Sequence, residues 1–158
     1  MAESSKILIV DDDPGIRLAL RDFLIQNGFD DVTAAANGFE ALAYLQSNTP
    51  HLIISDITMP QMDGYTFVQQ LRNDPRLKSI SVIVLTGRSE MVELFKMAEI
   101  YNFLLKPVEP RALLAMVNRI LGKGEPSPGH DSENFLNKIE KMESSLEWVK
   151  KIIKRKRP

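Results

Sequence analysis

The chain has 158 residues, of which 44% are hydrophobic, and a formal net charge of −1, so it can bury one core with some chain left over. It contains no cysteine, and no stretch approaches the roughly 20 apolar residues of a membrane span. Residues 1–6 also lack the basic and then apolar pattern of a signal peptide, so we expect a cytoplasmic protein with no membrane span.

The N-terminal third of the chain predicts two strand–helix pairs. Residues 7–10 are all apolar, which is typical of a central strand in a parallel sheet, and residues 32–36 form a weaker candidate suited to a flanking position. A helix is expected to begin at Pro14 and to end near Asn27 and Gly28. Apolar residues recur at helical spacing after both strands: Ile16, Leu20, Phe23 and Leu24, and then Phe39, Leu42 and Leu45.

Three further pairs follow in the same alternation. Residues 52–54 and 82–85 are apolar runs typical of central strands, and residues 101–105 form a weaker flanking candidate. Apolar residues at helical spacing follow each strand: Phe67, Val68 and Leu71; Val92, Phe95 and Met97; and Leu113, Leu114, Val117 and Leu121. The pattern predicts an α/β fold of the (βα)5 type, with a five-stranded parallel sheet covered by helices on both faces. Such a doubly wound sheet binds its ligand at the carboxyl ends of its strands.

Acidic residues stand where this rule expects chemistry. The first strand runs into Asp11, Asp12 and Asp13, and the third strand runs into Asp56. Carboxylates that converge at one end of a sheet raise each other's pKa unless a cation lies among them, and hard oxygen ligands suit Mg²⁺. A simpler role, starting a helix near its positive dipole end, suits Asp13 but does not explain Asp56.

A hydroxyl and an ammonium group follow the next two strands. Thr86 comes after the fourth strand and Lys106 after the fifth. Beside a metal-bound carboxylate, these two groups form a receptor for the oxygens of a phosphoryl group, which need several donors. Four strand ends with matching chemistry therefore predict one phosphoryl site.

At this point a resemblance becomes specific. The runs Ile7–Pro14, Ser55–Gly64, Leu85–Gly87 and Leu104–Pro107 together resemble the receiver domains of bacterial response regulators. The resemblance covers residues 6–121 in order and implies a flavodoxin-like strand order 2-1-3-4-5, in a receiver domain at residues 1–121. It also implies signalling through a sensor histidine kinase or a phosphotransfer protein.

The resemblance assigns a role to each polar residue. Asp56 would accept the phosphoryl group, and Mg²⁺ would be held by Asp11, Asp12, Asp56 and the backbone carbonyl of Thr58. Thr86 would donate its hydroxyl to the phosphoryl oxygens, and Lys106 would supply positive charge. The family also implies a cis bond between Lys106 and Pro107, which proline makes accessible.

Switching is expected to begin at the phosphoryl group, toward which Thr86 and Lys106 can move. In the family an aromatic residue three positions before the lysine turns inward, here Phe103, although ordinary core packing explains this residue equally well. The readout would be the face formed by the fourth helix, the fifth strand and the fifth helix. Because the segment between Thr86 and Lys106 is shorter than the family pattern, partner choice at this face is open. Thr58 and Arg88 flank the site and are candidates for tuning the phosphoryl lifetime.

The remainder of the chain reads as an appendage. Residues 122–130 are rich in Gly, Pro and Ser, as in a linker, and residues 131–158 are expected to form an amphipathic helix with a basic end. Its apolar residues follow a coiled-coil heptad: Phe135, Ile139, Met142, Leu146, Val149 and Ile153.

This helix is too short to be stable alone, so it needs a partner. A homodimer through residues 135–153 and docking on its own receiver or on another protein both stay open. The basic end suits nucleic acid or an anionic membrane, but it also suits a solvated helix end. We expect no direct DNA binding, because this appendage has no room for an ordinary winged-helix domain.

Two other functions compete with phosphoryl signalling. An aspartyl-phosphate phosphohydrolase usually has a second aspartate two positions after the nucleophile, and here that position is Thr58. A scaffold that never accepts phosphate would be expected to lack one of the acidic, hydroxyl or lysine positions, which are all present. We therefore expect a phosphoacceptor signalling protein, limited to self-phosphorylation and slow autodephosphorylation, and no enzyme.

Overall fold

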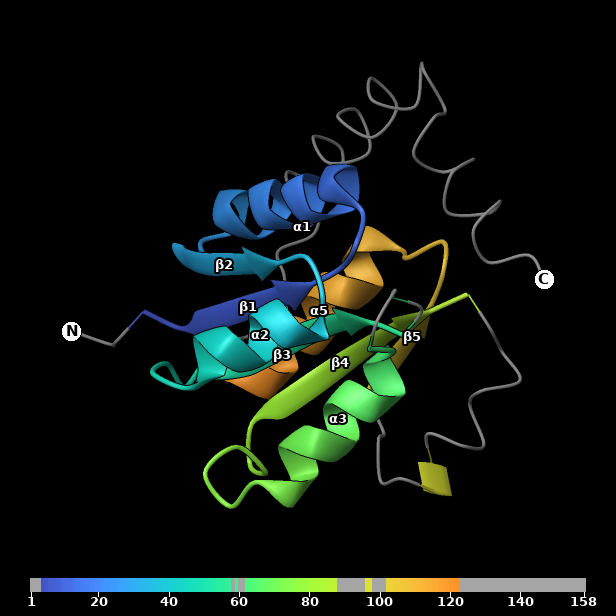
Figure 1. The fold of residues 1–158 in the computed structure, drawn as a ribbon. Helices are drawn as coiled ribbons and strands as arrows, with labels where there is room; N and C mark the ends of the chain where they lie inside the picture. Colours follow the sequence, from blue (N-terminus) through green and yellow to red (C-terminus); the bar gives the residue numbers. More distant parts are fainter. Residues whose placement is uncertain (1–3, 58, 60–61, 88–95, 98–101, 123–158) are drawn as a thin grey trace.

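The computed structural model describes residues 4–57, 59, 62–87, 96–97 and 102–122. Five parallel strands form one sheet in the order β2-β1-β3-β4-β5, which confirms the predicted topology (Figure 1). The strands are β1 (Lys6–Val10), β2 (Asp31–Ala35), β3 (Leu52–Asp56), β4 (Ser81–Thr86) and β5 (Phe103–Leu105). The two weaker strand candidates, β2 and β5, form the two edges of the sheet, as their composition predicts.

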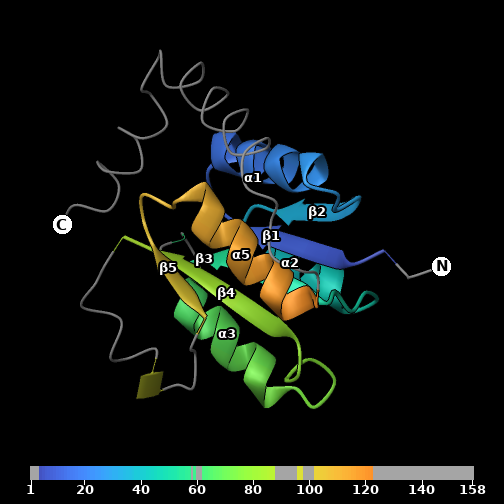
Figure 2. The same ribbon diagram turned by 180° about the vertical axis from the view of Figure 1, so that it is seen from behind.

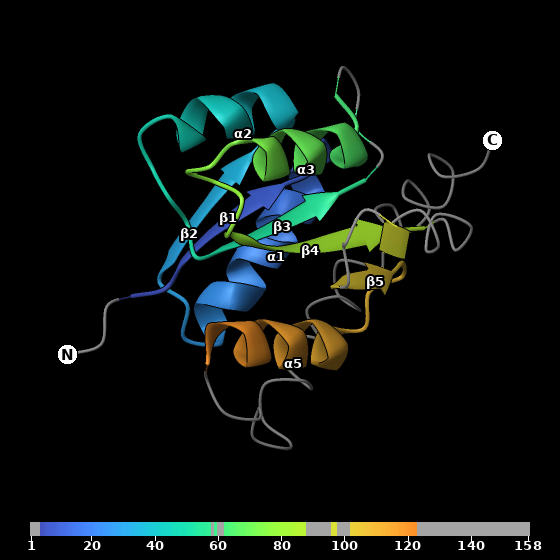
Figure 3. The ribbon, with the colours of Figure 1, turned by 90° about the horizontal axis from the view of Figure 1, so that it is seen from below.

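Helices cover both faces of the sheet. They are α1 (Pro14–Gln26), α2 (Gly38–Leu45), α3 (Gly64–Asn73) and α5 (Pro110–Leu121). Helices α1 and α5 lie on one face, and α2 and α3 lie on the other, as the view from below in Figure 3 and the view from behind in Figure 2 both show. Within the described residues, no helix combines the length and the apolar character that a bilayer span requires.

The strands supply both hydrophobic layers because successive side chains point to opposite faces. In β1, Ile7 and Ile9 pack with α1 and α5, whereas Leu8 and Val10 pack with α2 and α3. The central strands are therefore apolar at almost every position, and β3 is buried along its whole length. This buried sheet holds the ends of its strands in place, where the polar residues stand.

Local sequence signals set the ends of the helices. The Asp13 side chain accepts hydrogen bonds from the backbone N–H of Gly15 at 2.8 Å and of Ile16 at 3.3 Å, and so caps α1. The helix ends at Gln26 with Asn27 as its C-cap, and Gly28 follows with φ +92°, a conformation that favours glycine. The helix role considered for Asp13 is thus confirmed.

The predicted apolar face of the second helix is partly wrong. Phe39 is 54% exposed, and the buried residues of α2 are Gly38, Ala41 and Leu45, with Leu42 partly buried. The helix approaches the loop before α3 so closely that a Cβ on Gly38 would lie 2.7 Å from the sulfur of Met62. Its small side therefore faces the core, and the bulky Phe39 is left outside.

The fourth predicted helix cannot be compared in full. Val92 and Phe95 lie outside the described residues, as does Tyr101 of the fifth strand. Met97 is described and is 83% exposed, so its predicted place on a buried face is wrong. The other predicted helices are confirmed, with Leu113, Leu114 and Val117 buried on α5.

Candidate functional site

Three carboxylates converge at the carboxyl ends of the two central strands. Asp11 and Asp12 follow β1, and Asp56 ends β3, which pairs with β1. One oxygen of each carboxylate lies within 4.8 Å of an oxygen of the other two, so a single cation can contact all three. Asp11 and Asp56 are only 1% and 2% exposed, while Asp12 is half-buried. The predicted convergence of the acidic residues is therefore observed.

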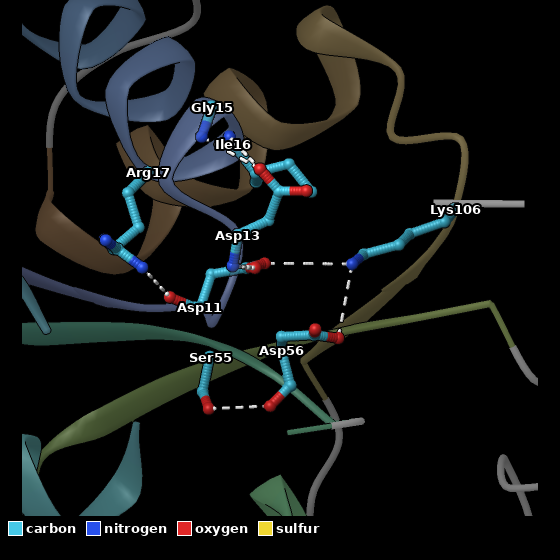
Figure 4. Close-up of polar contacts among 8 residues, drawn as sticks. All are labelled: Asp11, Asp13, Gly15, Ile16, Arg17, Ser55, Asp56 and Lys106. Carbon is cyan, nitrogen blue, oxygen red and sulfur yellow. Dashed lines mark hydrogen bonds and ion pairs between the residues drawn. The ribbon is translucent and has the colours of Figure 1, made fainter. Parts of the chain in front are cut away.

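The ammonium group of Lys106 reaches into this acidic cluster of Asp11, Asp12 and Asp56 (Figure 4). Lys106 Nζ lies 3.2 Å from Asp56 Oδ1 and 3.8 Å from Asp11 Oδ2, and its side chain is only 5% exposed. Lys106 follows β5, and its backbone N–H donates to the carbonyl of Thr86 at 2.7 Å. The cis peptide bond between Lys106 and Pro107, which the family resemblance implied, is present.

The electrostatics of the cluster favour a bound cation. Burial first, and then the neighbouring Asp56 carboxylate, raise the pKa of Asp11 from 3.8 to about 7 against the attraction of Lys106. Asp11 Oδ2 is buried and, within the described residues, accepts no hydrogen bond. Asp11 and Asp56 share the single positive charge of Lys106. An oxygen-rich, negatively charged site of this kind fits Mg²⁺.

The remaining predicted residues stand nearby or outside the described part of the chain. Thr86 is fully buried at the end of β4, one position beyond Leu85, which pairs with Asp56. Phe103 begins β5, is half-buried and packs against the core on the α2 and α3 side. Its packing fits the simple core role, and its role in switching stays a prediction. Thr58 and Arg88 lie outside the described residues, as do residues 123–158.

The sequence alone did not single out Arg17. Its Nη1 donates to the backbone carbonyl of Asp11 at 2.7 Å (Figure 4). A usable signal existed, because a cation in the first turn of a helix is disfavoured by the helix dipole and so calls for a nearby acceptor.

Gly64 supports the site through its lack of a side chain. Its backbone N–H donates to the carbonyl of Ile57 at 2.8 Å, and a Cβ at this position would lie 2.3 Å from the carbonyl oxygen of Asp56. Only glycine permits this close approach. The start of α3 is thereby packed directly against the end of β3.

The fold and this site define a class of protein. The family model for the response regulator receiver domain matches residues 7–118, and the chain belongs to this family.

Individual relatives agree with this family. Response regulator Rre1 of Synechocystis is 42% identical over 136 residues, which cover 85% of this chain and 59% of Rre1. Chemotaxis protein CheY of Bacillus subtilis is 34% identical over 116 residues, which cover 73% of this chain and 97% of CheY. A solved structure of CheY4 of Vibrio cholerae has a TM-score of 0.69 and 34% identity, covering 75% of this chain and 99% of CheY4. These relatives are signalling proteins, and the alignment spans little more than half of Rre1.

Proposed function

We propose that the chain is a response regulator receiver that takes a phosphoryl group on Asp56 from a phosphohistidine of a sensor histidine kinase or a phosphotransfer protein. The observation that carries the proposal is the position of Asp56, held 3.2 Å from Lys106 and within the acidic cluster at the end of β3. Membership of the receiver family supports the choice of donor.

Mg²⁺ is the proposed cofactor, since receiver domains bind this ion at a cluster of aspartates and the present residues fit it. Asp11, Asp12 and Asp56 would hold it, together with the backbone carbonyl of Thr58. The bound ion would offset the negative charge that otherwise repels an incoming phosphoryl group.

The chain's own groups account for the transfer. A carboxylate oxygen of Asp56 forms a bond to phosphorus while the bond from phosphorus to the histidine nitrogen of the donor breaks, and the freed nitrogen takes up a proton from water. Lys106 neutralises charge on the acylphosphate oxygens, and the hydroxyl of Thr86 donates to them. In autodephosphorylation, water slowly attacks the phosphorus, the bond from phosphorus to the Asp56 oxygen breaks, and inorganic phosphate leaves. Thr58 and Arg88 are proposed to tune the rate of this step.

The proposed output is a rearrangement of Thr86, Phe103 and the surface around β5 and α5. Residues 1–121 would act as the receiver and residues 122–130 as a linker to the helix at 131–158, which would bind a partner or form a homodimer through residues 135–153. Sedimentation of the full chain beside a version ending at Leu121 tests this output, because equal monomer masses for both would exclude the homodimer.

Phosphorylation itself is tested by intact mass measurement. The full chain is incubated with acetyl phosphate or phosphoramidate and Mg²⁺, beside Asp56→Asn and beside Asp22→Asn, an exposed carboxylate on α1. One phosphoryl adduct is expected on wild type and on Asp22→Asn, and none on Asp56→Asn or after chelation of the metal. Asp56 is 2% exposed, so a donor must be able to reach a buried carboxylate. A wild type that stays unmodified would mean that a donor does not reach it, and would support a scaffold instead. Rapid multiple turnovers of a phosphomonoester would support a phosphohydrolase.

A further inference from the structure

Arg17 is a cation in an electrostatically unfavourable place. It is the fourth residue of α1, in the first helical turn, where the helix dipole favours negative charge. Its guanidinium Nη1 lies 2.7 Å from the carbonyl oxygen of Asp11, in a half-buried hydrogen bond that spans six positions of the chain. A charge-assisted bond of this length is stronger than a bond between neutral groups.

With this bond, the backbone N–H, the backbone carbonyl and one carboxylate oxygen of Asp11 all have hydrogen-bond partners. The backbone N–H of Asp11 donates to the carbonyl of Ala35 on β2 at 3.2 Å, and Asp11 Oδ1 accepts from the backbone N–H of Asp13 at 2.9 Å. The Asp11 carbonyl is held by Arg17. The remaining polar atom, Asp11 Oδ2, is directed toward Lys106 and the acidic cluster, as Figure 4 shows.

We propose that Arg17 is a positioning residue for cation binding. It holds the Asp11 peptide so that Asp11 Oδ2 faces Lys106, which also contacts Asp56, without accepting a hydrogen bond from the described residues. Groups that orient metal ligands in this way contribute strongly to affinity although they never touch the ion. The proposal rests on the proposed Mg²⁺ site and adds to it a residue on α1.

A simple charge effect predicts the opposite result, so the two explanations can be separated. Arg17 is positively charged and lies beside a ligand of the proposed cation, so its charge alone repels the ion. Removing that charge would tighten Mg²⁺ binding if only charge mattered. If Arg17 positions Asp11, its removal weakens binding.

The test is a calorimetric Mg²⁺ titration of the full chain at pH 8. We expect Arg17→Ala to weaken Mg²⁺ binding by about tenfold, and Arg17→Lys to fall between it and wild type, because lysine keeps the charge and one donor. Arg21→Ala is the matched control, since Arg21 is an exposed arginine one turn further along α1. The Mg²⁺ affinity of this variant should stay within about twofold of wild type.

Thermal unfolding in chelator and in saturating Mg²⁺ separates positioning from general stability. Positioning predicts that the rise in Tm from chelator to Mg²⁺, at equal Mg²⁺ concentration, is smaller in Arg17→Ala than in wild type. Unchanged or tighter binding by Arg17→Ala overturns the proposal, as does an equal loss of Tm in both conditions with unchanged affinity. If Arg17→Ala does not fold, the test uses Arg17→Lys, and a wild-type Mg²⁺ affinity of that variant overturns the proposal. If the wild type binds no Mg²⁺, the proposed metal site is wrong as well. This result differs from one in which the wild type binds Mg²⁺ and only the positioning role of Arg17 is refuted.

Discussion

Replacement of Asp11 by Asn should stabilise the metal-free protein at neutral and alkaline pH. The pKa of Asp11 is raised from 3.8 to about 7, first by burial and then by the Asp56 carboxylate. Between these two pH values the folded protein binds more protons at this group than the unfolded chain does. The free energy of unfolding therefore falls as pH rises from about 4 to about 7, and the full loss persists above that.

The magnitude follows from the same shift. A change from 3.8 to about 7 corresponds to about 4 kcal/mol at 1.36 kcal/mol per pKa unit, which is the largest gain that neutralising Asp11 can give. Asparagine keeps an oxygen for the bond from the Asp13 N–H, but its buried amide also needs a partner. We expect a net gain of about 1–3 kcal/mol at pH 8 and almost none at pH 4.

Urea unfolding without metal, with chelator present, at pH 4 and pH 8 measures this effect. Asp22→Asn is the control, because it makes the same chemical change at an exposed site on α1, and it should leave stability within about 0.5 kcal/mol of wild type. In saturating Mg²⁺ the order should reverse, since the wild type gains binding energy that Asp11→Asn lacks. An Asp11→Asn protein less stable than wild type at pH 8 in chelator would show that the cluster is not electrostatically strained.

Three further outcomes are expected. Mg²⁺ affinity should fall by up to about tenfold per pH unit below about pH 7, where binding displaces the Asp11 proton, and level off above it; a flat calorimetric profile between pH 5.5 and 8 would contradict the raised pKa. Lys106→Gln removes the cation 3.2 Å from Asp56 and should cost about 3 kcal/mol in urea unfolding at pH 8, whereas the exposed Lys78→Gln should cost almost nothing. Gly64→Ala places a Cβ 2.3 Å from the Asp56 carbonyl oxygen and should cost about 1–3 kcal/mol and slow phosphorylation by acetyl phosphate. Gly28→Ala, with φ +92° and open space around it, should leave phosphorylation unchanged, and equal rates in both glycine variants would argue against a role for the close approach at Gly64.

Most of the fold could be predicted because its signals are local. Strands buried on both faces must be apolar throughout, and Pro14, Asp13 and Gly28 mark the ends of α1 by their own backbone chemistry. The acidic cluster followed from one topological rule, since the carboxyl ends of neighbouring parallel strands meet at one edge. Residues 45 positions apart, Asp11 and Asp56, were therefore placed together without any knowledge of contacts.

The errors concern tertiary packing. Helical periodicity in α2 was compatible with burying either Phe39 or Ala41, and only the close approach of Met62 to Gly38 decides between them. The place of Arg17 in the first turn of α1 signals that it needs an acceptor. That this acceptor is the Asp11 carbonyl depends on how the chain turns from β1 into α1, which residue spacing alone does not reveal. Both features arise from a particular backbone path and not from a pattern of residue types.

The position of Lys106 has a mechanical consequence. Its side chain contacts Asp56, while its backbone N–H is bonded to Thr86 at the end of the ladder between β4 and β5. Strand β5 has only three residues and pairs with a neighbour on one side, so fewer bonds hold it than hold any central strand. Such an element is the easiest part of a sheet to displace. A displacement of the Lys106 ammonium group within the acidic cluster is thus transmitted, through this one residue, to the short edge strand β5.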